Sequence, residues 1–230
     1  MKLQQALQGA LAGFKTLTQS PARIPDFNRA FQDGAVMPGD GSIVEAVIER
    51  RVIGELHLPS GRLVACDPAF GEENPFEVAL NPGRYPVILS IADLKGDKRV
   101  TCAMIQVKTE TPVTWKPAPR QGDKLDSRPG YGVDSATGCF MDETTAVIWR
   151  RQVEKAEFND AVTDQMEEGY GDVCCWGNIT LDTAEGRVNA VIFSTGYGDG
   201  YYRSYWGYTA DGEVACLVAD FGVFKPSMEL

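Results

Sequence analysis

The sequence predicts an α+β fold in which antiparallel, twisted sheets of short strands pack against a long central helix. Two observations predict it. Short β-branched runs separated by turn residues occur on both sides of the chain's middle, and the stretch from 143 to 168 between them contains neither Gly nor Pro. The chain has 230 residues, of which 43% are hydrophobic, so it is long enough to bury a core of its own.

The N-terminal segment, residues 1–42, is predicted to be helical. From Leu3 onwards, apolar residues recur at helical spacing and predict an amphipathic helix over residues 2–18. Its apolar face packs either on the rest of this chain or on another chain. A short second helix is predicted through Phe27 and Phe31.

The main domain is predicted to span residues 43–230 and to be built mostly of short strands. Turn residues between consecutive runs, such as Pro59-Ser60-Gly61, predict that several neighbouring strands form hairpins. The expected strands lie at 43–48, 51–58, 62–66, 84–92 and 98–108, and then at 173–181, 187–194, 201–208 and 213–221.

The middle of the main domain separates these two groups of strands. Residues 116–130 are rich in Pro and Gly, which predicts a surface loop and the best position for a boundary within the domain. Asp142 then opens the stretch without Gly or Pro. We expect a helix over about 142–168, in one or two pieces.

The charge balance restricts the partners. Lys and Arg total 22 against 32 Asp and Glu, a formal net charge of -10. Such a chain repels phosphate backbones and anionic membranes, so we expect neither nucleic acid nor a membrane as a partner. A protein partner, basic in charge, is expected instead. The N-terminus lacks the apolar run of a secretory signal, and the six cysteines read as small buried hydrophobes, so a cytoplasmic location is expected.

The tripeptide Gly-Tyr-Gly occurs three times, at 130–132, 169–171 and 196–198, each time with an aspartate close behind it. One interpretation is a flexible backbone that approaches a ligand, with an aromatic wall and a carboxylate beside it. The other is turn chemistry, with the tyrosine packed over its turn. The first interpretation makes these residues ligand-binding candidates: Tyr131, Asp134, Ser194, Tyr197, Asp199 and Tyr201.

Four separated blocks carry a resemblance to a known family. They are Leu58–Pro68, Pro82–Val87, Gly130–Asp134 with Gly138 and Asp142, and Ser194–Tyr201 with Gly207, Asp211–Gly212 and Asp220–Phe221. In these blocks the chain resembles the bacterial family designated domain of unknown function 4241. The resemblance implies a shared fold and a shared cluster of glycines and acids, and it implies no catalytic activity.

The acids inside those blocks are Asp67, Asp134, Asp142, Asp199 and Asp220. If the fold brings carboxylates together, they would bind a divalent cation through oxygen ligands, with Asp134 and Asp199 as the metal candidates. The alternative gives each acid a cap or turn role, for example Asp142 as a helix cap. His57 is the only histidine, which excludes any two-histidine metal site.

Two functions follow from these features. The first is an acidic binding protein without catalysis, of the immunity type that neutralises a toxin, with no cofactor expected. The alternative is a divalent-metal-dependent hydrolase or ligand-binding enzyme, with Asp134 and Asp199 as ligands and Tyr131 and Tyr197 lining the site.

Overall fold

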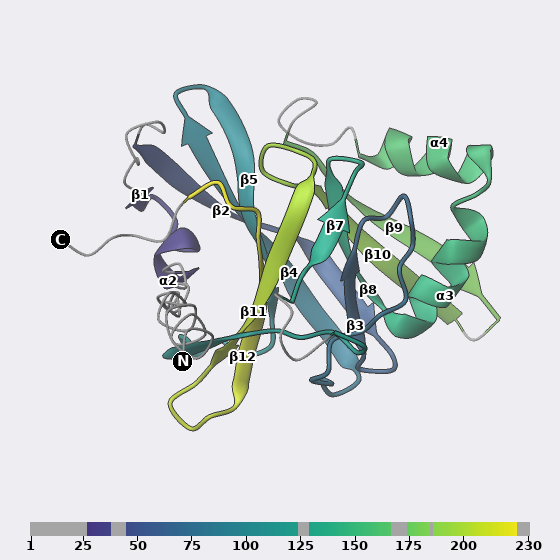
Figure 1. Cartoon of the computed structure of the whole chain (residues 1–230), viewed down its shortest axis with the longest axis horizontal. Helices are drawn as coiled ribbons and strands as arrows, with labels where there is room; N and C mark the ends of the chain where they lie inside the picture. The colour runs from purple at the N-terminus through teal and green to yellow at the C-terminus, as the bar shows by residue number, and fades with distance from the viewer. Residues whose placement is uncertain (1–26, 38–44, 124–128, 167–173, 185, 225–230) are drawn as a thin grey trace, which may run out of the picture.

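The computed structural model describes residues 27–37, 45–123, 129–166, 174–184 and 186–224, and two antiparallel β-sheets dominate it (Figure 1). Of the described residues, 50% are in strands and 13% are helical. The predicted helix over residues 2–18 lies outside the described residues. No helix in the described part of the chain has the length and apolar character that crossing a membrane requires.

The larger sheet has the strand order β1-β2-β4-β5-β12-β11-β6, and β7 pairs with β11 beside this path. All of its pairings are antiparallel. Its strands are β1 (Val36–Met37), β2 (Ala46–Leu58), β4 (Gly83–Leu94), β5 (Asp97–Gln106), β6 (Thr114–Pro117), β7 (Tyr131–Val133), β11 (Gly200–Tyr208) and β12 (Val214–Asp220).

The smaller sheet has the order β3-β8-β10-β9, also antiparallel. Its strands are β3 (Leu63–Cys66), β8 (Thr137–Asp142), β9 (Trp176–Thr183) and β10 (Gly186–Ser194). β8 lies inside this sheet and is buried over nearly its whole length. Because both of its faces are covered, β8 lacks the alternation by which the other strands were predicted, and it was not among the expected strands.

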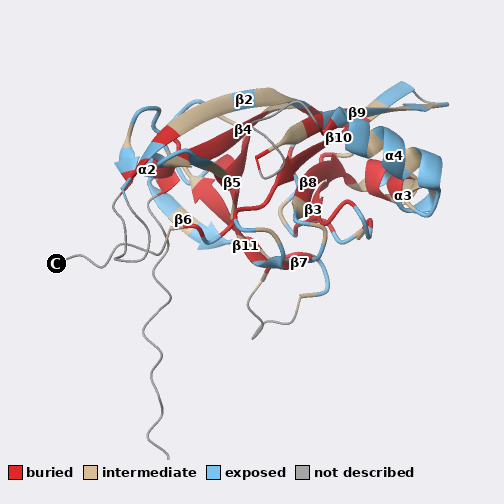
Figure 2. Cartoon of the chain, turned by 90° about the horizontal axis from the view of Figure 1, so that it is seen from above, coloured by how far each residue is buried: buried red, intermediate tan, exposed pale blue. Residues whose placement is uncertain are grey.

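The main core lies between the two sheets. Leu56, Val87 and Trp206 of the larger sheet and Phe140 and Phe193 of the smaller sheet belong to one buried cluster. Figure 2 shows buried residues concentrated along β4, β5, β8 and β10. Burial of apolar side chains between two sheets is therefore the main source of stability in this fold.

Helices cover the outer faces of this sandwich. α2 (Phe27–Ala30) lies where a short helix through Phe27 and Phe31 was predicted, although it ends at Ala30, and it packs Phe27 and Ala30 against the larger sheet. α3 (Glu143–Gln152) and α4 (Ala156–Gln165) lie over the smaller sheet, where Trp149 of α3 joins a second buried cluster. The order of layers is thus α2, larger sheet, smaller sheet, and then α3 with α4 (Figure 1).

The prediction of an α+β fold around a long central helix over 142–168 is wrong. The described part of that region, residues 142–166, holds two helices of 10 residues each, and they lie on the outside of the smaller sheet. The aromatic rings of Trp149 and Phe158 are 4.8 Å apart. In one continuous helix these residues would be about 13.5 Å apart along the axis, so their contact requires the turn at 153–155. Sheet-on-sheet packing forms the core instead of a helix.

The expected hairpin at Pro59–Gly61 is also wrong, because β2 pairs with β4 and β3 pairs with β8. That turn carries the chain from one sheet to the other. The expected strands 43–48 and 51–58, from Ala46 onwards, form the single strand β2, which continues through its charged middle and is irregular only near Gly54. The hairpins β4–β5, β9–β10 and β11–β12 confirm the expected neighbours.

Candidate functional site

Asp67 directly follows β3, and its carboxylate joins the loop after β3 to the loop before β8. Its Oδ1 accepts hydrogen bonds from the Ala69 N–H at 2.8 Å and the Ser135 hydroxyl at 2.6 Å. Its Oδ2 accepts from the backbone N–H groups of Asp134 at 2.8 Å and Ser135 at 2.9 Å. Asp67 is buried. Four hydrogen bonds to one buried carboxylate satisfy its lone pairs and fix the loop before β8.

The loop between β10 and β11 joins this arrangement. The carboxylate of Asp199 accepts from the Ala136 N–H at 3.1 Å, and the Thr195 N–H donates to the Ala136 carbonyl at 3.1 Å. Gly196 has φ +49°, and a Cβ at this position would lie 2.9 Å from the Phe221 carbonyl oxygen, so only glycine fits without a shift.

The loop surface is therefore one connected unit made of residues 67–71, 130–136 and 195–201. Its members come from three separate blocks of the sequence. The structure brings Asp67, Asp134 and Asp199 into this region, whereas Asp142 lies at the opposite end of β8 and Asp220 ends β12 in the larger sheet.

The six candidate residues divide into two groups. Tyr131 and Ser194 are buried. The Tyr131 hydroxyl finds no hydrogen-bond partner among the described residues, and burial raises its pKa well above the ordinary value. The Ser194 hydroxyl accepts from the Cys175 N–H at 3.0 Å. These two side chains belong to the interior.

The other four candidates, Asp134, Tyr197, Asp199 and Tyr201, are exposed. Tyr197 is 57% exposed and Tyr201 is 59% exposed, although the Tyr201 hydroxyl donates to the Gly130 carbonyl at 3.0 Å. The Arg99 guanidinium lies 5.4 Å from the centre of the Tyr197 ring. These side chains are available to a partner.

Sequence reasoning missed a third exposed aromatic residue on the loop surface, Phe70, which is 58% exposed. It follows Asp67-Pro68 in the turn that Asp67 stabilises. The available signal was a large apolar residue next to Gly71 within a turn, a position that a core residue rarely occupies.

Asp142 caps α3, as the alternative interpretation of the acids expected. Its Oδ1 accepts from the Thr144 N–H at 2.9 Å and hydroxyl at 2.7 Å. Its Oδ2 accepts from the Ser60 N–H at 3.0 Å and hydroxyl at 2.7 Å. The residue is fully buried. Asp142 thus also ties the turn between the two sheets to the start of α3.

The hypothesis of a divalent-metal site with Asp134 and Asp199 as ligands is not supported by a set of metal ligands in the described residues. Within the ranges that the structure describes, no group of three or more His, Cys, Asp or Glu side chains is placed to hold a metal ion.

Burial raises the pKa of the Asp220 carboxyl to about 6, while a hydrogen bond from the Gly222 N–H acts in the opposite direction. The folded state therefore retains a proton that the unfolded state releases above about pH 4. The stabilisation that this bound proton supplies is complete below about pH 4, and it is lost as the pH rises through about 6.

We accordingly expect Asp220→Asn, which removes this titration, to raise the free energy of unfolding at pH 7 by roughly 1–3 kcal/mol and to have little effect at pH 4. Urea denaturation of both proteins at the two pH values measures the difference. An equal gain at both pH values would show that the effect does not come from the ionisation of Asp220.

A cavity of about 360 Å³ adjoins the loop surface between the smaller sheet and the two helices. Trp149, Met166 and Ile192 give it apolar walls, and Ser135 and Thr137 contribute hydroxyls. These hydroxyls are 2.7 Å apart, and Ser135 is already bonded to Asp67. The cavity therefore shares Ser135 with the loop surface.

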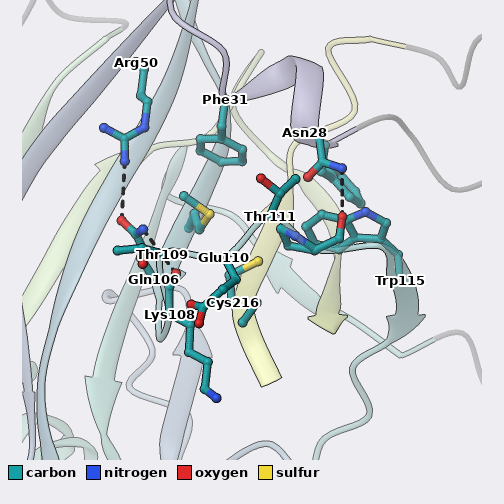
Figure 3. A pocket seen from close by; sticks show the side chains of 14 residues that line it. Asn28, Phe31, Arg50, Gln106, Lys108, Thr109, Glu110, Thr111, Trp115 and Cys216 are labelled. Atoms are coloured by element: carbon teal, nitrogen blue, oxygen red, sulfur yellow. Dashed lines mark hydrogen bonds between the residues drawn. The ribbon is translucent and has the colours of Figure 1, made fainter. Parts of the chain in front are cut away.

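A different cleft, of about 200 Å³, lies between α2 and the segment after β5 (Figure 3). Some of its polar side chains already have partners within the protein. The Asn28 amide donates to the Pro112 carbonyl at 3.0 Å, and the Arg50 guanidinium points toward the Gln106 side-chain oxygen at 3.4 Å (Figure 3).

The fold and the loop surface define a two-sheet, antiparallel β protein with its connected loops at one end. Residues 56–219 match the family model described as protein of unknown function (DUF4241). The chain belongs to this family, which confirms the predicted resemblance. Neither the search of curated proteins nor the search of solved structures found a match.

Proposed function

We propose that this chain is a non-catalytic binding protein that engages a basic protein partner through the loop surface, in the manner of an immunity protein that neutralises a toxin. The observation that carries the proposal is the set of three exposed aromatic side chains on the loop surface, whose segments are joined by hydrogen bonds to the Asp67 and Asp199 carboxylates. They are Phe70, Tyr197 and Tyr201.

Aromatic side chains supply much of the binding energy in protein interfaces, because they bury a large area with few rotatable bonds. Their loops are fixed here by the Asp67 carboxylate and by the Asp199 contact with Ala136. A surface that is ordered before binding loses less conformational entropy on association. The rigidity of the loop surface therefore supports binding.

The charge of the chain supports a basic partner. Asp134 and Asp199 are exposed on the loop surface, and the whole chain carries a formal charge of -10. A negative surface attracts a positive one and raises the rate of encounter, and this effect weakens with salt. The carboxylates of Asp67 and Asp142 each accept four hydrogen bonds, which supports a structural role for them rather than proton transfer.

The test is affinity capture from the native cell with the tagged wild-type chain and with the double variant Tyr197→Ala/Asp134→Asn. We expect a basic protein at stoichiometric yield, released as NaCl rises, and a loss of affinity of about tenfold or more in the double variant, the equivalent of 1.4 kcal/mol. Binding is then measured by titration calorimetry with the purified partner.

Asp211→Asn is the matched control. Asp211 is an exposed acid on the turn after β11, at the opposite end of that strand from Tyr201. The substitution Asp211→Asn removes the same charge as Asp134→Asn, and it should leave binding of the partner unchanged. The proposal fails if no basic protein is recovered at stoichiometric yield, or if the double variant binds as tightly as the wild type.

A further inference from the structure

A polar groove of about 300 Å³ lies apart from the loop surface, where β2 meets the β9–β10 hairpin. It carries the chain's only histidine and an arginine from the family block Pro82–Val87. Its walls come from both sheets, and its principal lining residues are Glu55, His57, Arg84, Asn178, Arg187 and Asn189.

A buried amide builds the floor of this groove. Asn189 is only 7% exposed. Its Nδ2 donates to the Glu55 carbonyl at 2.8 Å and to the Asn178 side-chain oxygen at 2.7 Å, and its Oδ1 accepts from the His57 N–H at 2.9 Å. The amide therefore pairs with the backbone edge of β2 as a neighbouring strand would, and it joins the two sheets.

The irregular position in β2 permits this approach. Gly54 has φ +142°, and a Cβ there would lie 2.9 Å from the Asn178 side-chain nitrogen. A side chain at position 54 would push Asn178 away. The local backbone thus keeps β9 against β2, and the walls of the groove are fixed by contacts within the protein.

His57 is held in one orientation. Its Nδ1 lies 3.1 Å from the Arg187 carbonyl oxygen. Because a carbonyl only accepts, Nδ1 must carry the hydrogen, and the ring nitrogen Nε2 is left for another partner. Arg84 lies directly opposite His57 in the β2–β4 register, so both side chains leave the same face of the sheet.

The guanidinium of Arg84 lines this groove. No carboxylate of the described residues forms an ion pair with Arg84, whereas the second arginine of the groove, Arg187, pairs with Asp182 at 2.9 Å. A guanidinium presents a planar fork of donors that matches a carboxylate or a phosphate. Glu55 adds a carboxylate that accepts a hydrogen bond, which suits a ligand that also carries a donor.

We propose that this groove binds a small organic anion, a carboxylate or phosphate monoester that also carries a hydroxyl group. Its anionic group contacts the Arg84 fork beside His57, and its hydroxyl donates to Glu55. The groove is separate from the loop surface, so this proposal does not depend on the proposed binding of a protein partner there.

The single histidine makes a direct test available. We would follow the ring signals of His57 by NMR in the full chain while adding citrate or glycerol 3-phosphate, with NaCl at matched ionic strength as the reference. We expect a saturable shift with at least one of the two probes and none with NaCl. Which probe saturates at lower concentration distinguishes a carboxylate from a phosphate ligand.

Arg84→Gln should weaken binding at least tenfold, and Arg150→Gln, the same change at an exposed arginine of α3, should leave it unchanged. If Arg84→Gln fails to fold, as judged by its backbone amide spectrum, Arg84→Lys, which keeps the charge but not the planar fork of donors, replaces it and should also weaken binding. The absence of saturation with both probes below about 10 mM, or equal binding by the Arg84 and Arg150 variants, would overturn the proposal.

Discussion

Asp142→Ala is expected to lower the free energy of unfolding by about 3–5 kcal/mol, because the loss of a helix cap adds to the loss of buried hydrogen bonds. The substitution removes an acceptor from the Ser60 and Thr144 N–H groups and from their hydroxyls, at a fully buried position. Chemical denaturation followed by tryptophan fluorescence measures the change.

Two controls separate the causes. Asp142→Asn keeps one acceptor oxygen and should cost less than the alanine variant, about 1–2 kcal/mol. Glu143→Gln removes the neighbouring carboxylate, which pairs with Arg62 and is 32% exposed, and should cost less than about 1 kcal/mol. If Asp142→Ala destabilises no more than Glu143→Gln, the cap and the Ser60 contacts do not hold the turn.

Asp67→Ala is expected to be the second large effect, about 3–4 kcal/mol, because it leaves the N–H groups of Asp134 and Ser135 without their buried acceptor. The effect should also be local. In amide hydrogen exchange, we expect faster exchange in residues 130–136 than in the wild type, while β4 and β5 keep their relative protection.

Asp199→Asn is the matched control for this prediction. Its exposed carboxylate accepts a single backbone hydrogen bond, from Ala136, and the amide oxygen of asparagine can accept it too. We expect a change below about 1 kcal/mol. Equal destabilisation by the two substitutions, or exchange unchanged in residues 130–136 of Asp67→Ala, would show that Asp67 does not anchor the loop surface.

Local patterns were enough to predict the hairpins β4–β5, β9–β10 and β11–β12, but they wrongly predicted one at Pro59–Gly61. The turns at Lys95-Gly96 and Ala210-Asp211-Gly212 each separate two β-branched runs, and the strands on either side pair with each other. The prediction of one helix over 142–168 was wrong because the absence of Gly and Pro permits a long helix without requiring one. The break depends on tertiary packing, since it lets both Trp149 and Phe158 reach the smaller sheet.

The candidate site was predictable only where the signal is local. The position of Asp142 before Glu143 indicated a helix cap, and the structure confirms it. The role of Asp67 between the loops was not predictable in the same way. Apart from Ala69, its partners Asp134 and Ser135 lie 67 and 68 residues further along the chain, and two of its four bonds come from their backbone N–H groups, which carry no sequence signal.

The same limit applies to the aromatic candidates. Tyr131 and Tyr197 occupy the centres of identical Gly-Tyr-Gly tripeptides, yet the first is buried and the second is 57% exposed. The difference arises from strand pairing, since Tyr131 lies in β7 opposite Tyr202 of β11, whereas Tyr197 lies in the connecting loop. The tripeptide itself does not determine which way its tyrosine faces.

The most direct test of the loop surface is amide hydrogen exchange of the wild-type chain with and without the captured basic partner. We expect protection on binding to be concentrated in residues 67–71, 130–136 and 195–201. Protection concentrated instead in α4 or in the β9–β10 hairpin, with the loop surface unchanged, would contradict the account.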